Sequence, residues 1–520
     1  MIGDKKMDKQ LKKIYLYIGI FVAIIFIGAT YAFFTAGMSS ENSTTVRADA
    51  GTMKITYSGG ADINLAGIYP KDDVWATKTI TVTGNNTTDA EMYYKLTLVV
   101  DSNTFKTDDP LQYELVSTND STNGEIIPAI SKKDITGTSI ELGSGKFAKA
   151  NNASHTYLLK IYYPKKATSQ NTNQGAAFSA HVEITSAKAP KTNGKLSELV
   201  LYNNEVKTPI TTPGAAISTA SEALLASAED DYGTSYYFRG AVTNNYVEFA
   251  NKCWRIVRVE GDGSVKLILH NDNPTGAANP CDAANNSTSA AFARYSDETY
   301  KSAFNEKYND NAYVGFKYGT PGSSTYEATH ANTNKSTILT NLETWYTNNL
   351  KTYESVIDDN VWCNDKSNVT DTSYDPWSMT PNGLGYGRNQ TYYGATQRLV
   401  STSKIVGGTG PSLKCNGELS KINSKVGLIT ADELAYAGYA IGTGNTTTYL
   451  QENATDTYWW SLSPGYFDDG VAGVWGVGGS DGGFGSGDVS DADGVRPSIP
   501  LKSTTNVTGE GTSDKPFVVD

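Results

Sequence analysis

The chain has 520 residues, more than one compact hydrophobic core usually holds, so we expect at least two folded domains joined by connectors. It carries 43 Lys and Arg against 55 Asp and Glu, a formal net charge of −12. This balance argues against nucleic acid as a partner, because phosphate recognition needs clustered basic residues. With 49 glycines, 33 tyrosines and few long helical patterns, the composition predicts a mainly β protein with some α.

The N-terminus contains one targeting signal, in which a lysine-rich stretch precedes the uncharged run 14–34. As a helix this run is about 31 Å long, enough to cross the hydrocarbon core of a bilayer. The preceding lysines place the N-terminus in the cytoplasm and the rest of the chain outside the cell. We therefore predict that residues 1–37 form a cytoplasmic stub and a single transmembrane anchor. The alternative is a signal peptide cut after Ala32, which gives a secreted protein.

Residues 45–188 alternate apolar and polar side chains with a period of two, as half-buried antiparallel strands do. The runs 94–100, 157–163 and 178–184 show this best, and turn-forming clusters separate about seven such strands, which predicts an antiparallel β-sandwich. The segment NQGAAFSAHVEITS resembles the camelysin-like and biofilm-fibre β-sandwich family. Members of that family polymerise or act as spacers, so the resemblance implies either a stalk or a fibre-forming domain.

The stretch 189–231 changes character: one short apolar run is interrupted by Pro209 and Pro213, and Thr and Ser are frequent. This pattern predicts a semi-extended linker. We place the second domain at 232–502 and a C-terminal tail at 503–520.

The second domain opens with a predicted hairpin, since the apolar runs 254–259 and 265–269 flank the turn sequence Gly-Asp-Gly. Residues 336–350 place their large apolar side chains on one face of a helix. Thr430 and Glu433, three residues apart before an apolar run, predict a capping box at the start of another helix. Both helices are expected to pack on a core.

All four cysteines fall in this second domain, at Cys253, Cys281, Cys363 and Cys415. An even number of cysteines in an oxidising compartment predicts two disulfides. Of the three connectivities we favour the sequential one, Cys253 with Cys281 and Cys363 with Cys415, because each closes a local loop. A tetrahedral metal site is the rival interpretation, although the C-x-x-C spacing typical of such sites is missing from the sequence.

The stretch 458–501 has an unusual composition. Bulky apolar residues begin it and GVRPSIPL ends it, whereas 465–494 is nearly all Gly, Asp, Ser, Val, Ala and aromatic residues. Glycine adds no apolar area and buried aspartates need partners, so this segment is expected at the surface. Single aromatic residues among small polar ones are typical of binding surfaces. The alternative is a β-meander with Gly-rich turns and no ligand.

The framework WWSLSP, followed by a Gly/Ser/Asp-rich segment and GVRPSIPL, resembles the C-terminal end of bacterial surface proteins with a C-type-lectin-like fold. Among these are the variable proteins of diversity-generating retroelements, in which adenine-directed substitution changes ligand-facing residues. The resemblance implies an α+β domain whose two chain ends pair in one sheet, with a hypervariable face between them. The predicted ligand-binding residues are Tyr466, Phe467, Asp468, Asp469, Trp475, Asp481, Phe484 and Asp488.

No cofactor is predicted, and calcium is the alternative. Many lectin-like domains bind sugars through calcium, and carboxylates could supply its oxygen ligands. The candidates are Asp468, Asp469, Asp488, Asp491 and Asp493. The calcium-loop pattern and the sugar-binding triplets EPN and WND are missing from the sequence, so exposed turn aspartates are the preferred interpretation.

These patterns together predict a membrane-anchored adhesion or recognition protein of the bacterial cell surface, with a β-sandwich stalk, a linker and a lectin-like head. The expected partner is an extracellular protein, a glycan, a phage or another cell-surface ligand. A structural fibre or matrix protein is the first alternative. The second is an enzyme of the formylglycine-generating type, which shares the lectin-like fold but needs reactive cysteines; because the cysteines are expected to be paired, we predict that the chain is not an enzyme.

Overall fold

The structure is a computed structural model of the chain. It describes residues 44–49, 52–86, 91–118, 124–148, 150–187, 191–296, 299–403, 406–416 and 418–520. The predicted stub and anchor, residues 1–37, lie outside these ranges. Within the described ranges, none of the helices is long and apolar enough to cross a membrane. The chain divides into two compact units, Met1–Ala189 and Pro190–Asp520, and each is described by itself.

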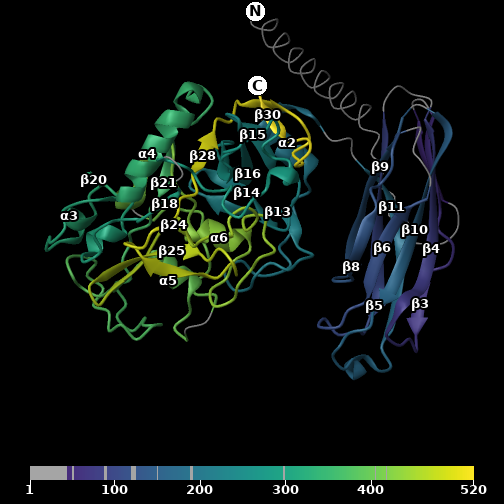
Figure 1. The fold of residues 1–520 in the computed structure, drawn as a ribbon, viewed down its shortest axis with the longest axis horizontal. Coiled ribbons are helices and arrows are strands. Elements are labelled where there is room, and N and C mark those ends of the chain that lie inside the picture. Colours follow the sequence, from purple (N-terminus) through teal and green to yellow (C-terminus); the bar gives the residue numbers. More distant parts are fainter. Residues whose placement is uncertain are drawn as a thin grey trace, which may run out of the picture. The chain divides into compact units, whose positions relative to one another are not determined.

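The first unit is built from two antiparallel sheets that face each other (Figure 1). One sheet has the order β1-β2-β4-β10-β6-β8, with strands Thr44–Asp49, Thr52–Ser58, Lys71–Asn86, Ala150–Tyr163, Gln112–Ser117 and Ile130–Asp134. The other has the order β3-β11-β5-β9-β7, with strands Ile63–Ala66, Ala177–Ala187, Met92–Asn103, Ser139–Phe147 and Gly124–Glu125. A single 3-10 turn, Asn171–Asn173, follows β10.

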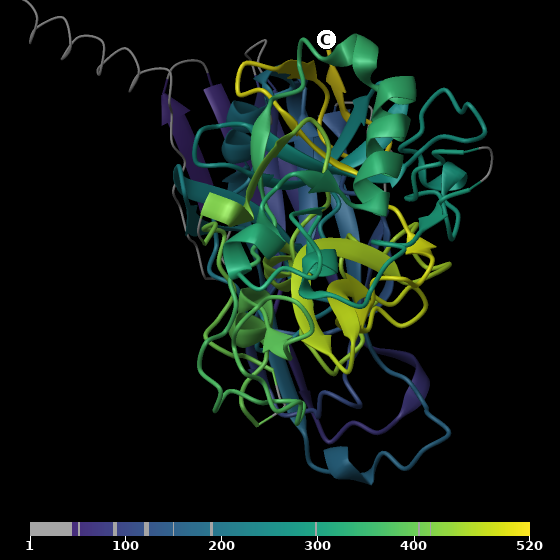
Figure 2. The same cartoon turned by 90° about the vertical axis from the view of Figure 1, so that its left-hand side faces the viewer.

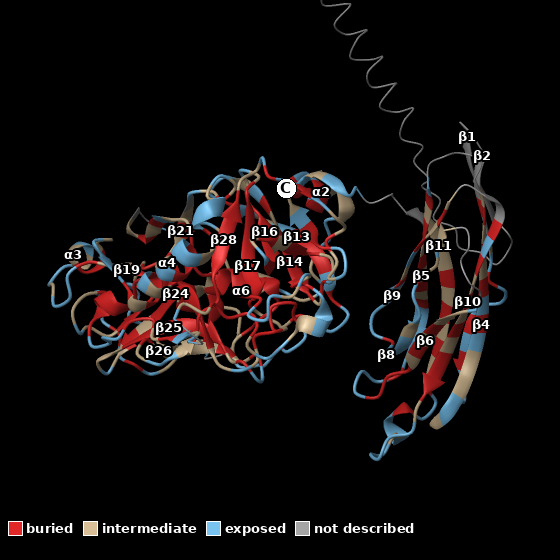
Figure 3. Ribbon diagram, turned by 45° about the horizontal axis from the view of Figure 1, so that its top comes forward, coloured by how far each residue is buried: buried red, intermediate tan, exposed pale blue. Residues whose placement is uncertain are grey.

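Every second side chain of the long strands is buried between the two sheets. In β5 the buried positions include Leu96 and Leu98, and in β10 they include Leu159 and Ile161. Figure 3 shows this interior in red, with exposed residues on the outer surfaces and loops. The period-two pattern of the sequence therefore predicted both these strands and the faces that they bury.

The second unit is organised around a nine-stranded sheet, mostly antiparallel. Its strands in spatial order are β12 (Asn193–Lys195), β29 (Asn506–Thr508), β30 (Phe517–Val519), β15 (Tyr246–Phe249), β16 (Lys252–Val259), β14 (Gly233–Gly240) and β13 (Ala223–Asp230). Two further strands extend it from β16, namely β17 (Val265–Asn271) and β28 (Ser498–Leu501). The hairpin of β16 and β17 confirms the prediction made from its apolar runs and Gly-Asp-Gly turn.

A smaller, six-stranded sheet carries the C-terminal stretch. It consists of β18 (Lys301–Ser302), β27 (Asp493–Gly494), β24 (Trp459–Asp468), β25 (Val471–Val477) and β26 (Phe484–Asp488), with β22 (Thr391–Tyr392) paired to β24. Two short ribbons complete the strands of the unit: β19 (Lys317–Tyr318) with β20 (Asn334–Lys335), and β21 (Asn360–Cys363) with β23 (Lys421–Ser424).

The α-helices of the second unit are short, and the longest packs on the large sheet (Figures 1 and 2). They are α2 (Leu196–Asn203), α3 (Tyr326–His330), α4 (Thr337–Asn349), α5 (Gly394–Leu399) and α6 (Ala431–Ala437), with 3-10 turns at Ala283–Asn285, Asn311–Val314, Lys351–Tyr353 and Glu418–Ser420. In α4, Trp345 meets Trp254 of β16 edge-to-face, with ring centroids 6.1 Å apart. Helix α6 begins with the predicted capping box between Thr430 and Glu433.

The two ends of the second unit meet in its large sheet. Strand β28 pairs antiparallel with β17, where Leu267 lies opposite Ile499. The hydroxyl of Ser498 donates to the carbonyl of Leu267 across the same strands, at 2.6 Å. The chain therefore leaves this part of the sheet after β17 and returns to it at β28, and residues 272–497 lie between these two strands.

Two segments that we expected to lie outside the folded domain are part of it. In the expected linker, 189–231, α2 buries Leu199 and Val200 in the core and β13 pairs along its length with β14. In the expected tail, 503–520, β30 pairs in parallel with β15. The prolines mark turns rather than a spacer, and the short apolar runs beside them gain their stability only from tertiary burial.

The C-terminal strand is expected to be essential to the second unit, because Phe517 is buried in the core while Val518, its neighbour, is exposed. Replacing Phe517 by Ala should lower the free energy of unfolding by about 3 kcal/mol or more through the lost burial and the cavity left behind. Val518→Ala is the matched control and should change it by less than about 0.5 kcal/mol. Denaturant unfolding of both variants measures the difference; equal effects would place this strand outside the cooperative core.

Candidate ligand-binding site

The predicted binding stretch forms three neighbouring strands of the small sheet, β24, β25 and β26, with β22 on the far side of β24. Across them Tyr392, Tyr466, Gly473 and Asp488 lie opposite one another in register. Side chains opposite one another in antiparallel strands share a face of the sheet. Tyr466, Gly473 and Asp488 are thus brought together on one face.

Three of the predicted contact residues are core residues instead. Phe467 and Trp475 are 0% exposed and Phe484 is 4% exposed. The rings of Trp475 and Phe484 are 4.8 Å apart, and the indole N–H of Trp475 donates to Thr396 Oγ1 at 3.2 Å. The interpretation of these aromatic residues as displayed ligand contacts is therefore wrong.

Trp475 is buried because residues from earlier parts of the chain cover it, and the sequence of 458–501 alone does not reveal them. Trp475 shares a face of β25 with Gly473, which lies opposite the half-buried Tyr466, so alternation alone would place Trp475 on this partly open face. Helix α5 contributes Thr396 to its surroundings, and Trp377 lies against it with ring centroids 6.5 Å apart. Both covering residues come from earlier parts of the chain.

Two glycines of the stretch, Gly473 and Gly476, make room for aromatic rings. A Cβ added to Gly473 would lie 2.5 Å from Cε1 of Tyr466, so the tyrosine ring rests directly on the backbone of β25. Gly476 allows the same close approach by the ring of Tyr458. Substitution of either glycine would displace a ring, and these positions do not tolerate free choice of side chain.

The part of this surface that remains open is an aromatic pair surrounded by carboxylates. The rings of Trp377 and Tyr466, both half-buried, meet edge-to-face with centroids 5.8 Å apart. We call the surface formed by Trp377, Tyr466, Asp468, Asp488 and Asp491 the acidic aromatic face. Our sequence reasoning missed Trp377, which lies in a loop between β21 and β22 and carries no periodic signal.

Burial and nearby negative charges raise the pKa of Asp468, Asp491 and Tyr466 at the acidic aromatic face. Burial, and then the charge of Asp469, raises the pKa of Asp468, although Gln390 donates to its Oδ1 at 2.6 Å. Burial, and then the charge of Asp488, raises the pKa of Asp491. The pKa of Tyr466 is also raised, first by burial and then by Asp488, Asp468 and Asp491. Burial is the largest cause of each of these shifts, and the carboxylate charges that add to it contribute a negative potential at the face.

Of the remaining predicted residues, Asp469 and Asp481 are exposed and lie at opposite ends of the β24–β26 strands. Asp469 occupies the turn between β24 and β25 with a φ of 45°. Asp481 lies in the turn between β25 and β26, where its carboxylate accepts from the N–H of Gly483 at 2.9 Å. Asp481 is thus separated from the acidic aromatic face. In β27, burial, and then the charge of Asp491, raises the pKa of Asp493 to about 6.

The calcium alternative receives no structural support. Within the part of the chain that the structure describes, no group of three or more His, Cys, Asp or Glu side chains is arranged to hold a metal ion. Of the aspartates considered for calcium, Asp468, Asp469 and Asp488 lie at one end of the β24–β26 strands, whereas Asp491 lies in the bend after β26 and Asp493 in β27.

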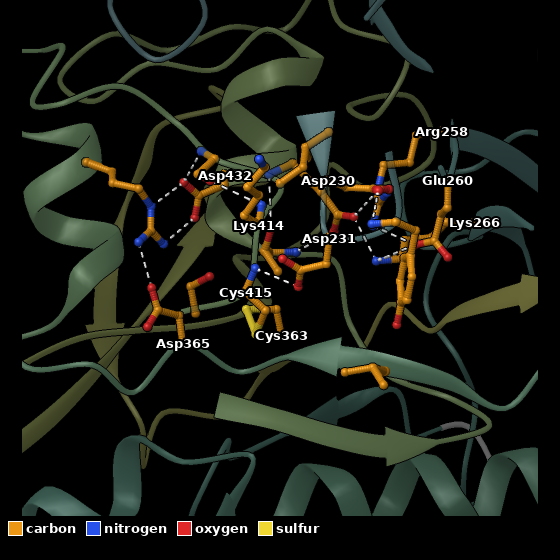
Figure 4. A pocket seen from close by; sticks show the side chains of 18 residues that line it. Asp230, Asp231, Arg258, Glu260, Lys266, Cys363, Asp365, Lys414, Cys415 and Asp432 are labelled. Carbon is orange, nitrogen blue, oxygen red and sulfur yellow. Dashed lines mark hydrogen bonds and ion pairs between the residues drawn. A yellow bond between two sulfur atoms is a disulfide. The ribbon is translucent and has the colours of Figure 1, made fainter. Parts of the chain in front are cut away.

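A second candidate site is a small pocket, with a cavity volume of about 40 Å³, between β13, β16, β17, β21 and α6 (Figure 4). Two groups of ion pairs line it. In one, Arg258 lies 2.8 Å from both Asp230 and Glu433, and Lys266 lies 2.8 Å from Glu433. In the other, Arg398 pairs with Asp365 and with Asp432, each at 2.6 Å.

Glu433 joins the first group of ion pairs to helix α6. One of its oxygens accepts from both Arg258 and Lys266, and the other accepts from the N–H of Thr430 to close the capping box. Burial alone would raise its pKa, but the charges of Lys266 and Arg258 lower the pKa of Glu433 to about 2. The carboxylate is therefore a structural anion that attaches α6 to the large sheet. The charged residues within the otherwise apolar β16 were the sequence signal of this buried pairing.

The cysteines are paired as the sequence predicted, Cys253 with Cys281 and Cys363 with Cys415. Cys253 and Cys281 are buried beside Tyr246. Cys363 and Cys415, in contrast, are half-buried and line the pocket. The two disulfides therefore lie in different environments.

Comparison with known proteins does not extend this description: no protein-family model matches the chain, and no curated protein matches it as a relative. Function has to be argued from the two sites.

Replacing Trp475 by Ala should lower the free energy of unfolding by about 3 to 5 kcal/mol, since it empties a packed part of the core and leaves Phe484 without its partner. Tyr466→Ala removes a half-buried ring and should cost clearly less. Thermal or denaturant unfolding compares the two. A small loss for Trp475→Ala would return this residue to the surface.

The Glu433 network should make stability depend on pH. Because the pKa of Glu433 falls from 4.5 to about 2 on folding, its contribution is fully present above pH 4.5 and is lost as the pH falls toward 2. Glu433→Gln should therefore flatten the dependence of unfolding free energy on pH in this window, and cost about 3 kcal/mol at pH 7 because two buried cations lose a partner. Glu229→Gln, at an exposed position, is the control; an unchanged pH profile in Glu433→Gln would refute the assignment.

Proposed function

We propose that the chain is a bacterial cell-surface recognition protein whose second unit has a C-type-lectin-like fold and binds a ligand at the acidic aromatic face. The pairing of β17 with β28 supports the fold assignment, since a lectin-like domain pairs its two chain ends and extends its loops between them. Two disulfides support an oxidising, extracellular compartment for this unit. The sandwich of the first unit then serves as a stalk.

The observation that carries the proposal is the half-buried pair of Trp377 and Tyr466 among carboxylates. Tryptophan and tyrosine dominate binding surfaces because they offer large, rigid contact areas. Their ring faces attract cations, and the negative potential of the surrounding carboxylates also favours cations. A positively charged ligand, such as a Lys- or Arg-rich segment of another surface protein, fits this face best.

We propose a structural role rather than catalysis for the ion pairs of the pocket, because its buried cations are already committed. Arg258, Lys266 and Arg398 each form ion pairs with at least two carboxylates of the pocket wall. A group held in this way is a poor acid or base near neutral pH. The network instead attaches α6 to the large sheet.

Binding to synthetic peptides tests the recognition proposal. The purified protein should bind a Lys- or Arg-rich dodecapeptide more tightly than a Glu-rich one of equal length, and the affinity should fall with added salt. Tyr466→Ala and Asp488→Asn should each weaken binding about tenfold, equivalent to about 1.4 kcal/mol. Calorimetry or interferometry measures the affinities.

Asp282→Asn is the matched control, because it removes an exposed carboxylate that caps a 3-10 turn elsewhere in the same unit. It should leave the affinity unchanged. Equal weakening by Asp282→Asn would mean that net charge alone attracts the peptide, and tighter binding of the Glu-rich peptide would reject the proposed ligand class.

A further inference from the structure

The two disulfides of the second unit differ in their access to solvent. Cys253 is 0% and Cys281 1% exposed, and Cys253 lies in β16, which pairs with β15 and β17 on its two sides. Cys363 and Cys415 are half-buried and their sulfur atoms face the pocket (Figure 4). An attacking thiolate must reach a sulfur atom directly, so only the second disulfide is open to exchange in the folded protein.

The accessible disulfide ties the far end of an irregular segment to a strand, whereas backbone hydrogen bonds from Gly407, Thr409 and Gly410 hold the near end to α5. Cys363 ends β21, whereas Cys415 belongs to the described segment 406–416, which is mostly irregular. Near Cys415 the N–H of Cys415 donates to Asp231 at 3.1 Å and the N–H of Ser412 donates to Asp432 at 2.9 Å. The side chain of Asn416 donates to Ser367 at 3.3 Å, and the hydroxyl of Tyr436 donates to the carbonyl of Pro411 at 2.9 Å. A single bridge joins Leu413 to Asp230. The covalent bond is thus the strongest attachment of the segment at this end.

The same segment closes part of the pocket over buried charge. Ser412, Leu413, Lys414 and Cys415 line the pocket together with both groups of ion pairs. In Figure 4, Lys414 and Cys415 lie between the Asp365 and Asp432 carboxylates on one side and the Arg258 group on the other. Movement of this segment would admit water to ion pairs that are otherwise enclosed, such as Arg258 with Glu433.

We propose that Cys363–Cys415 is a thiol–disulfide exchange site, at which a dithiol reductant releases the segment 406–416 and opens the pocket, while Cys253–Cys281 keeps the fold intact. A thiolate of the reductant attacks one sulfur atom of the pair, forming a mixed disulfide as the Cys363–Cys415 bond breaks. The other cysteine leaves as a thiolate and takes a proton. The second thiol of the reductant then displaces the bound cysteine, so the pair gains two electrons and the reductant becomes a disulfide.

Graded reduction of the native protein tests the exchange step. The protein is incubated with increasing dithiothreitol at neutral pH without denaturant, free thiols are alkylated, and peptide mass spectrometry counts the label on each cysteine. Cys363 and Cys415 should be labelled at least ten times faster than Cys253 and Cys281, with the near-ultraviolet circular dichroism unchanged. Equal rates, earlier labelling of Cys253, or labelling only with loss of the dichroism would each overturn the proposal.

Hydrogen exchange tests the opening step. Reduction should accelerate amide exchange in 406–416 severalfold while the strands β16 and β17 keep their protection. The double variant Cys363→Ser and Cys415→Ser should show this faster exchange without reductant and should not respond to it further. Unchanged exchange of 406–416 in the double variant would show that the disulfide does not hold the pocket closed.

Discussion

The second unit depends on the pairing of β17 with β28, because this contact fixes where the long excursion between them starts and ends. Ser498 and Leu267, whose side chain and carbonyl bond across these strands, lie 231 residues apart in sequence. Closing so long a loop is entropically costly, and the pairing persists because both strands are fully buried between apolar neighbours. Helices α4, α5 and α6 and the small sheet are all positioned by this closure.

The buried ion pairs join helix α6 to the same part of the large sheet. Arg258 and Lys266 project from β16 and β17, and Glu433 from α6 neutralises both. Such a network adds little net stability relative to an apolar core, but it fixes the orientation of α6 because any other placement would leave two cations unpaired. Residues of β16 and β17 that seemed only to begin a hairpin therefore also determine where a helix far along the chain must lie. The pocket and its disulfide occupy the space that this arrangement leaves.

Short-range sequence patterns predicted much of this structure, whereas features that depend on contacts between distant residues were not predicted. The strands of the first unit, the hairpin of β16 and β17, the cap at Thr430 and the cysteine pairing all followed from short-range patterns. The position of 189–231 did not, since its apolar run is too short to indicate a helix without the core that receives it. The burial of Trp475 likewise depends on Trp377 and Thr396, whose approach no pattern within 458–501 encodes.

The contrast between buried and partly exposed residues constrains which positions in and around the acidic aromatic face can vary. Gly473 cannot accept a side chain beneath Tyr466, and Trp475 and Phe484 cannot become polar without opening the core. The carboxylates are different, because they are at least partly open to solvent and some feel like charges. Burial and then the charge of Asp469 raise the pKa of Asp468, and burial and then the charge of Asp488 raise the pKa of Asp491, so a neutral or basic residue at Asp468 or Asp491 relieves repulsion. Under the proposed function, substitutions at these positions change the charge of the preferred ligand at little cost in stability. Variation on a face with this proposed role is therefore expected to alter ligand charge before it alters ligand shape.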